Sequence, residues 1–286
     1  MTIKAAAKLV SLEEAIRSIP DGSAIALGGN TMHRSPCAAV PEFVRQGKTN
    51  LTLIKTAGSY DVDLLCGAGC VDKLVVAYVG FENLHGLAPQ FRGAIEQGRV
   101  VLEEQTCPTV IAALRAAAQG IPFMPIAGMT GSDLVDGRFR RVENPYGEGT
   151  VVTVPALWPD WAVIHVQEAD MEGNARIEGS HFEDVLMVKA ARHVLLTCET
   201  LVASDAFVSQ ADRTTISGFQ VAMVVHAPNG AWPASCAGHY PFDDPYLSAY
   251  YQAAQGGTPE LLRAFLRTHG AFAPAGDVPT ANRIQN

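Results

Sequence analysis

The sequence is short of charged residues. Asp, Glu, Lys and Arg make up 17% of its 286 residues, whereas soluble domains carry about 25%. Apolar residues account for 48% of the chain, which is enough for a sizeable buried core. A protein of this size with so little charge often covers part of its surface with another protein chain, and we therefore expect a partner chain.

An excess of positive charge and long apolar runs are also missing. The net charge of −8 argues against binding to the phosphate backbone of a nucleic acid. No stretch reaches the roughly 18 consecutive apolar residues of a membrane span. The first 18 residues lack the apolar core of a signal peptide. We expect a cytoplasmic protein that binds neither nucleic acid nor membrane.

The cysteines do not form a pattern typical of disulfides or metal sites. All six lie within apolar or small-residue segments of a long chain, which is unlike a disulfide framework. The close pair Cys66 and Cys70 has no second pair of Cys or His nearby, so the four ligands of a structural zinc site are lacking. The first expected strand is not followed by GxGxxG, the motif that binds dinucleotide cofactors. We expect no metal and no bound cofactor.

Short apolar runs alternate with helix-like segments through most of the chain. This alternation predicts an open, mostly parallel α/β sheet with helices on both faces. A helix is expected to open at Ser35, as N-cap, with Pro36 in its first turn. Strands are expected near residues 23–29, 51–56, 73–79, 99–105, 151–157, 161–167, 193–199 and 219–228, and helices near 12–18, 61–69, 89–97, 108–119, 245–254 and 259–266.

No change in composition marks a domain boundary, so we expect a single domain over residues 1–286. From about 128 to 150 the pattern breaks into polar, Gly-rich sequence with an Arg-rich cluster at 138–141. We interpret this segment as an excursion from the fold, either a flap or a contact with a partner. The C-terminal helices are expected at about 244–270.

The loop after the first expected strand is a candidate binding site. Ligands of open α/β sheets bind beyond the carboxyl ends of strands, close to helix N-termini. The amides of Gly28 and Gly29 could stabilise an oxyanion, and Asn30 could add a side-chain donor. Arg34 could hold a phosphate or carboxylate, and His33 is the one histidine in this loop. A tight turn with a surface arginine remains an equal alternative.

Two further strand ends carry polar residues. Glu103 and Glu104 close the fourth expected strand, and neighbouring residues of a strand point to opposite faces. One carboxylate could act as general base or nucleophile, or the pair could simply end the strand. Ser59 follows the second strand as a possible ligand contact, without the GxSxG motif of a nucleophile. His165, within an apolar run, is expected to be a hydrogen-bonded core residue.

Several segments in order resemble the A subunits of glutaconate-type class I CoA-transferases. The similar segments are ALGGNTMHRSPCAAVPEFVRQG, LEEQTCPTVIAALRAAAQGIPFMPI, EADMEGNARI, HFEDVLMVKAARHVLLTCE and HAPNGAWPASCAGHYPFDDPYL. The resemblance is collinear from about Leu12 to Tyr250. It implies a fold related to sugar-phosphate isomerases and a homologous B subunit in a heterodimer or heterotetramer.

The resemblance also implies a mechanism. In this family the acyl-CoA carbonyl is attacked by a glutamate of the B subunit, and an acyl-glutamyl anhydride becomes a glutamyl-CoA thioester. This chain is therefore expected to lack the nucleophile. Its loop from Gly28 to Arg34 is expected to help bind the acyl or CoA portion, with coenzyme A thioester as substrate.

Two alternatives to transfer stay open. Steroid ring-cleaving hydrolases share the A/B architecture, and in that branch Glu104, with Glu103 beside it, is the position that matches the catalytic glutamate of the A subunit. Thr31 and Met32 depart from the aromatic-containing loops of both branches, which leaves the substrate open. The related isomerase fold also occurs in ligand-sensing regulators, although neither end of the chain shows a DNA-binding helix-turn-helix.

Overall fold

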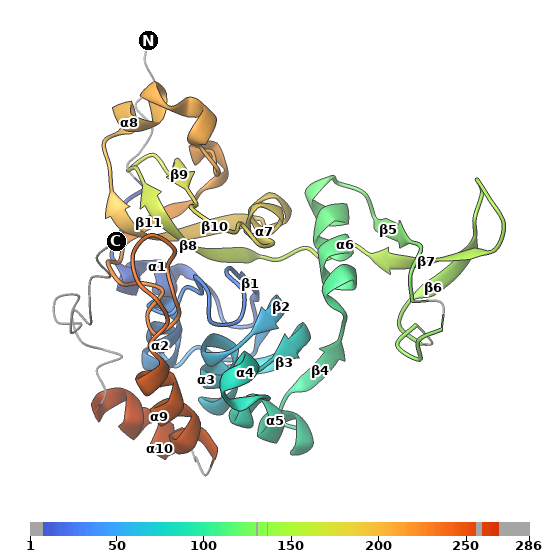
Figure 1. Ribbon diagram of the computed structural model, residues 1–286, viewed down its shortest axis with the longest axis horizontal. Coiled ribbons are helices and arrows are strands. Elements are labelled where there is room, and N and C mark those ends of the chain that lie inside the picture. The colour runs from blue at the N-terminus through green and yellow to red at the C-terminus, as the bar shows by residue number, and fades with distance from the viewer. Residues whose placement is uncertain (1–7, 130, 136, 256–258, 269–286) are drawn as a thin grey trace.

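The computed structural model describes residues 8–129, 131–135, 137–255 and 259–268. Its centre is an eight-stranded, mostly parallel sheet with helices on both faces (Figure 1), which confirms the predicted fold class. The strand order is β11 (Met223–His226), β10 (His193–Leu201), β8 (Trp161–Ala169), β1 (Ala24–Leu27), β2 (Leu51–Gly58), β3 (Val71–Val79) and β4 (Val101–Glu104), with β9 (Ala175–Arg176) antiparallel to β8.

Each face of the sheet has its own apolar core, because successive strand residues point to opposite sides. In β2, Leu53 belongs to one core and Ile54 to the other. The core that contains Leu53 is covered by α1 (Leu12–Ser18), α2 (Ala39–Arg45), α3 (Tyr60–Gly67), α5 (Pro89–Glu96), α9 (Asp244–Gln255) and α10 (Pro259–Thr268). The core that contains Ile54 is covered by α6 (Cys107–Ala118) and α7 (Asp184–Ala190).

A small arm projects from the body beside α6 (Figure 1). It is a separate antiparallel sheet with the order β5 (Phe123–Ile126), β7 (Thr150–Pro155) and β6 (Arg140–Glu143). The predicted excursion at 128–150 is thus the middle of this arm. The apolar strand predicted at 151–157 does not join the parallel sheet. It lies between two short neighbouring strands, and its Val152 and Val154 form a third core with Phe139.

The predicted helix start at Ser35 is wrong. The helix α2 begins at Ala39, because the Ser35 hydroxyl is used inside the fold. It donates to the Thr31 carbonyl at 3.2 Å and accepts from Lys55 Nζ at 3.0 Å. Short helices and turns at Glu82–His85 (α4), Ser204–Ser209 (α8), Ala211–Arg213 and Gly218–Gln220 complete the described elements.

Two other predictions concern the cysteines and the C-terminal helices. All six cysteines lie in the described ranges and none of them forms a disulfide, as the sequence predicts. The C-terminal helices predicted at about 244–270 are α9 and α10, whereas residues 1–7 and 269–286 of the predicted single domain lie outside the described part of the chain. No helix in the described ranges combines the length and apolar character required to cross a bilayer.

Candidate functional site at the carboxyl edge of the sheet

Four neighbouring parallel strands end at one edge of the sheet, where ligands of open α/β folds bind. The loop after β1 begins at Gly28, and the turn after β2 contains Ser59. The loop after β3 reaches Glu82, and Gln105 follows β4. The order β1, β2, β3, β4 within the sheet brings these loops side by side. The predicted site residues therefore share one edge.

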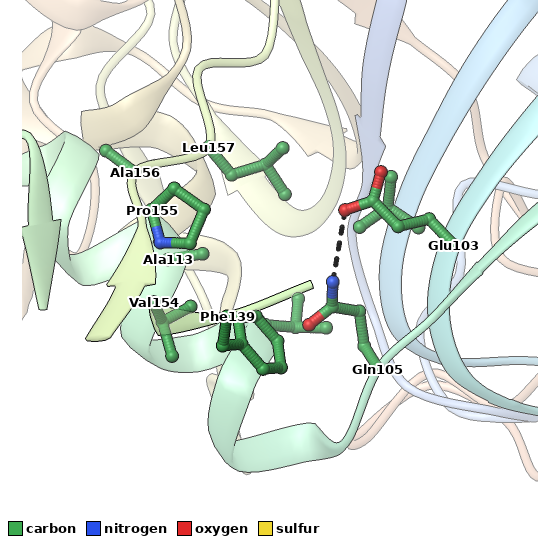
Figure 2. Close-up of a pocket in the computed structure, with 10 residues that line it drawn as sticks. Glu103, Gln105, Ala113, Phe139, Val154, Pro155, Ala156 and Leu157 are labelled. Carbon is green, nitrogen blue, oxygen red and sulfur yellow. Dashed lines mark hydrogen bonds between the residues drawn. The ribbon is translucent and has the colours of Figure 1, made fainter. Parts of the chain in front are cut away.

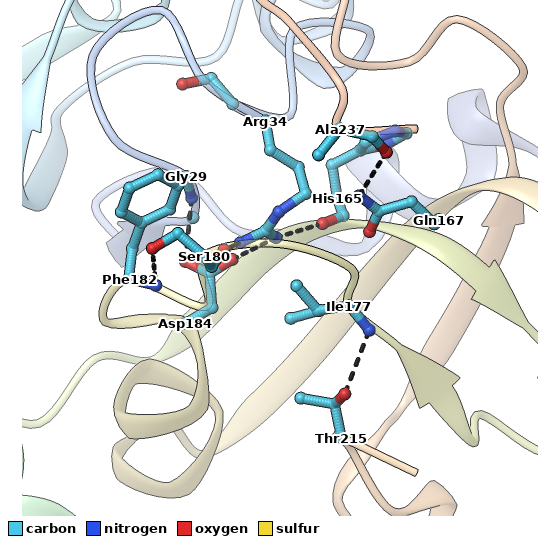
Figure 3. Close-up of polar contacts among 12 residues, drawn as sticks. Gly29, Arg34, His165, Gln167, Ile177, Ser180, Phe182, Asp184, Thr215 and Ala237 are labelled. Carbon is cyan, nitrogen blue, oxygen red and sulfur yellow. Dashed lines mark hydrogen bonds and ion pairs between the residues drawn. The ribbon is translucent and has the colours of Figure 1, made fainter. Parts of the chain in front are cut away.

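A buried ion pair fixes the loop after β1 (Figure 3). Arg34 is 3% exposed, and its Nη1 lies 2.5 Å from Oδ2 of Asp184, whose side chain is fully buried. The guanidinium also donates to the carbonyls of His165, at 2.7 Å, and Ser180, at 3.0 Å. The carboxylate that Arg34 binds is thus one of this chain, and binding of an external anion by Arg34 stays a prediction. Sequence reasoning missed Asp184, which follows 150 residues later.

The two glycines of this loop allow close packing of its backbone. Gly29 has φ +70, and a Cβ there would lie 2.5 Å from the Arg34 backbone. The amide of Gly29 donates to Asp184 Oδ1 at 2.9 Å, and that of Gly28 donates to the Val163 carbonyl at 2.9 Å. Both N–H groups are engaged inside the fold. Their predicted role as oxyanion donors stays a prediction, and it requires these hydrogen bonds to open.

Gly28→Ala is expected to lower the free energy of unfolding by about 1–3 kcal/mol, the usual cost of overpacking. A Cβ at Gly28 would lie 2.8 Å from Ile164 Cδ1 and 3.2 Å from both carboxylate oxygens of Asp184. Urea unfolding measures the change. Gly128→Ala is the matched control, because a Cβ at Gly128 meets nothing within 4 Å. Equal effects of the two substitutions would contradict the packing argument.

A second buried ion pair supports the same loop from β2. Lys55 and Asp61 are 1% and 0% exposed, and Lys55 Nζ lies 2.6 Å from Asp61 Oδ2. The ammonium also donates to the Gly28 carbonyl at 2.7 Å. Ser59, predicted as a ligand contact, is buried and donates to the Thr31 carbonyl at 2.8 Å. In this arrangement Ser59 holds the loop, and direct ligand contact by Ser59 stays a prediction.

Asn30 belongs to a polar group at the end of β2, together with Thr56 and Glu183. Its Nδ2 lies 3.4 Å from Thr56 Oγ1, which donates to Glu183 Oε2 at 2.8 Å. Glu183 is the residue that precedes α7, and it is partly exposed. The pKa of the Cys107 thiol, at the start of α6, is raised mainly by burial and less by the negative charge of Glu183. Asn30 was predicted from the sequence, whereas Glu183 was missed because its sequence context is that of an ordinary helix start.

His33 belongs to a second polar group on the loops after β1 and β3. Its Nδ1 lies 2.8 Å from Ser235 Oγ, and its Nε2 lies 3.8 Å from Glu82 Oε1. Thr31 Oγ1 donates to the same Glu82 carboxylate. Thr31, Arg34 and Glu82 have φ values of 44, 52 and 51, in the left-handed region that non-glycine residues rarely adopt. Backbone strain of this kind clusters at functional sites, and a ligand-binding role of these residues stays a prediction.

The two glutamates of β4 point to opposite faces, as the sequence predicts. Glu103 is paired with Val75, in the core beneath α6, and Glu104 with Val76, in the opposite core. Glu104 is exposed. Glu103 is partly buried, its Oε2 lies 2.6 Å from Lys73 Nζ, and it borders a pocket (Figure 2). The pocket is lined by Val75, Glu103, Gln105, Val110, Ala113, Phe139, Val154, Pro155, Ala156 and Leu157.

His165 is a fully buried, hydrogen-bonded core residue, as expected. Its Nδ1 lies 2.9 Å from Thr197 Oγ1 and its Nε2 lies 2.8 Å from Glu199 Oε1, which also accepts from Tyr240. Burial lowers the pKa of His165. Ligand atoms of His165, Glu199 and Cys236 lie within 4.8 Å of one another, a spacing compatible with a metal ion. Since the imidazole and the carboxylate already bind each other, we interpret the group as structural.

Comparison with known proteins places this geometry in a family. Residues 9–227 match the model of the family described as Coenzyme A transferase. The chain is 34% identical to the A subunit of glutaconate CoA-transferase from Acidaminococcus fermentans, over 91% of this chain and 87% of the relative. The crystal structure of that transferase superposes with a TM-score of 0.87, covering 91% of this chain and 88% of the other.

Relatives with other activities are also similar. A crystallised variant of the decarboxylase AibA/AibB has a TM-score of 0.80 at 36% identity, covering 91% of this chain and 98% of the other. The cholesterol ring-cleaving hydrolase IpdA subunit of Rhodococcus jostii is 31% identical over 92% of this chain and 91% of the relative. The family model covers well over half of the chain, and the named A subunits align with nearly all of it. The chain belongs to the coenzyme A transferase family.

Proposed function

We propose that this chain is the A subunit of a heteromeric CoA-transferase, which moves CoA between two carboxylic acids in a cleft shared with a homologous B subunit. The observation that carries the proposal is the 34% identity to the A subunit of a glutaconate CoA-transferase over nearly the full length of both chains. The low charge content of the chain, 17%, agrees with a covered surface. A heterodimer or heterotetramer, a cytoplasmic location and the lack of a bound cofactor stay predictions.

In the proposed reaction the nucleophile comes from the partner. The B subunit supplies a glutamate that attacks the acyl-CoA carbonyl and expels the CoA thiolate, which leaves an acyl-glutamyl anhydride. The thiolate then attacks the glutamyl carbonyl, so that the first acid departs and a glutamyl-CoA thioester remains. A second carboxylate attacks this thioester to form a new anhydride, and the thiolate returns to its acyl carbonyl. One difficult exchange is thus divided into easier steps.

This chain's part in the reaction is to present polar groups on a rigid loop. The ion pairs of Arg34 with Asp184 and Lys55 with Asp61 fix the backbone from Gly28 to Arg34. An asparagine amide has two N–H donors, and the Asn30 amide nitrogen contacts the Thr56 hydroxyl. We propose that its second N–H donates to the developing oxyanion. Donors fixed in advance need no reorganisation in the transition state.

The purified chain is expected to show no CoA transfer alone and full transfer after addition of its own B subunit. Transfer is measured with a CoA thioester donor and free carboxylate acceptors. Borohydride added during turnover should reduce a glutamyl thioester to an alcohol, and peptide mass mapping should place that alcohol on the B subunit. Robust transfer by the single chain would refute the two-subunit proposal, and a reduced glutamate on this chain would refute the assignment of the nucleophile.

A ring-opening CoA-thioester hydrolase is the second candidate. It is favoured by the acidic pair at the end of β4 and by the similarity to a subunit of the ring-cleaving hydrolase. In this proposal Glu104 acts as the base. Glu104→Gln in the assembled complex should abolish hydrolysis if the second candidate is correct, whereas the glutamyl thioester should still form on the partner if the enzyme is a transferase.

A further inference from the structure

The pocket beside β4 has apolar walls and one polar end (Figure 2). Its walls come from three places: the sheet, through Val75; the helix α6, through Val110 and Ala113; and the arm with the segment after it. The polar lining residues are Glu103 and Gln105. The pocket's volume of about 40 Å³ admits only the end of a chain, whereas sites that enclose a whole ligand measure about 300–1,000 Å³.

The polar end offers hydrogen-bond acceptors. Gln105 is 7% exposed, and its Nε2 donates to Glu103 Oε1 at 3.2 Å. The Gln105 Oε1 atom is buried and, among the described residues, has no hydrogen-bond partner. Turning the amide over would bring its oxygen against the Glu103 carboxylate, so the orientation follows from chemistry. Because buried acceptors in native proteins nearly always have a donor, the pocket suits an occupant with an O–H or N–H group.

The charged residue that lines this end, Glu103, already has a cationic partner. Glu103 Oε2 pairs with Lys73 Nζ at 2.6 Å, and Lys73 itself is 40% exposed. None of the residues that line the pocket in the described part of the chain is cationic. A carboxylate entering the pocket would therefore approach the Glu103 carboxylate without a cation of its own, an arrangement that disfavours the charged form of both groups.

The pocket lies on the same face of the sheet as the polar group above β2. Glu103 is paired with Val75, and Val75 is paired with Ile54. Two residues further along each strand, Gln105 and Thr56 point to this same face. They are two strand spacings apart, about 10 Å. A thioester held near Asn30 and Thr56 can thus bring the end of an acyl chain of about six carbons to Gln105.

We propose that this pocket receives the far end of the acyl group, and that it selects an uncharged aliphatic chain with a terminal hydroxyl over one with a terminal carboxylate. The hydroxyl donates to Gln105 Oε1, and the methylene groups contact Phe139 and Val154. The proposal rests on the proposed function, since it assigns an acyl specificity to the same site.

The test uses this chain in complex with its B subunit, with three donors of equal chain length: hexanoyl-CoA, 6-hydroxyhexanoyl-CoA and adipoyl-CoA. The kcat/KM for the hydroxy compound is expected to exceed that for adipoyl-CoA at least about tenfold. Gln105→Met should lower the ratio of kcat/KM for the hydroxy compound to kcat/KM for hexanoyl-CoA about tenfold. Glu103→Gln should raise kcat/KM for adipoyl-CoA about tenfold, because it removes the negative charge.

Glu143→Gln is the control, since Glu143 is an exposed residue of β6 outside the pocket, and it should leave the donor preference unchanged. A complex that transfers CoA but prefers adipoyl-CoA, or whose preference is the same after Glu103→Gln and Gln105→Met, overturns the pocket proposal alone. No transfer from any thioester overturns the proposed function instead. In that case calorimetric titration of the complex tests the pocket proposal. The Kd of 6-hydroxyhexanoyl-CoA should be about tenfold lower than the Kd of adipoyl-CoA.

Discussion

Arg34→Met is expected to cost about 3–5 kcal/mol of the free energy of unfolding, the usual effect of removing one partner of a buried ion pair. The substitution keeps much of the side-chain volume but leaves the fully buried Asp184 carboxylate without its cation. It also removes the donors to the carbonyls of His165 and Ser180. Chemical denaturation followed by circular dichroism measures the loss.

Arg192→Met is the matched control for this substitution. Arg192 pairs with Asp160 at 3.7 Å, but the two side chains are 73% and 40% exposed, so the loss should stay below about 1 kcal/mol. The double variant Arg34→Met, Asp184→Leu should recover part of the stability, because it leaves no buried charge unpaired. If Arg34→Met were no more harmful than Arg192→Met, the buried pair would not be what fixes the loop after β1.

The parallel sheet could be predicted because its signals are local. Each strand, such as β2 or β8, is buried on both faces and appears in the sequence as a short apolar run. The opposite orientation of Glu103 and Glu104 follows from the two-residue period of a strand. The prediction that the site lies at the carboxyl edge of the sheet follows from where open α/β sheets generally bind their ligands.

The contacts that fix the site could not be predicted, because they join segments far apart in the chain. The partner of Arg34, Asp184, lies on a helix of the opposite half of the sheet, and no periodicity links the two positions. Glu82 has a left-handed backbone conformation, with φ 51, which a non-glycine residue rarely adopts and no sequence pattern predicts here. The strand predicted at 151–157 was assigned to the wrong sheet for a related reason: β7 is as apolar as a central strand, and only its pairing with β5 and β6 reveals a separate sheet.

Asp63→Asn is expected to remove much of the pH dependence of stability between about pH 5 and 8. Asp63 is fully buried in α3, where it accepts from the Phe91 amide at 2.7 Å and from the Tyr250 hydroxyl at 2.9 Å. Burial raises its pKa to about 7 and outweighs these hydrogen bonds, which lower it. In the unfolded chain an aspartate has a pKa near about 3.9.

The direction in which pH changes the stability follows from the number of protons bound in the folded and unfolded states. Between these two pKa values the folded protein holds a proton on Asp63 that the unfolded chain has lost, so stability falls as pH rises through this window and levels off above about 7. From pH 5 to 8 this one group should remove about 3 kcal/mol from the wild type. Asparagine has no proton to lose. Its amide can still accept from the Phe91 amide and can donate to Tyr250, so both contacts survive.

The measurement is the free energy of urea unfolding at about pH 5 and pH 8, compared between wild type and variant. Other titrating groups cancel in the difference, including His165, whose lowered pKa acts with the opposite sign below pH 6.5. Asp72→Asn, at an exposed position of β3, should keep the wild-type slope. Equal slopes in the variant and the wild type would show that the buried carboxyl does not titrate in this range.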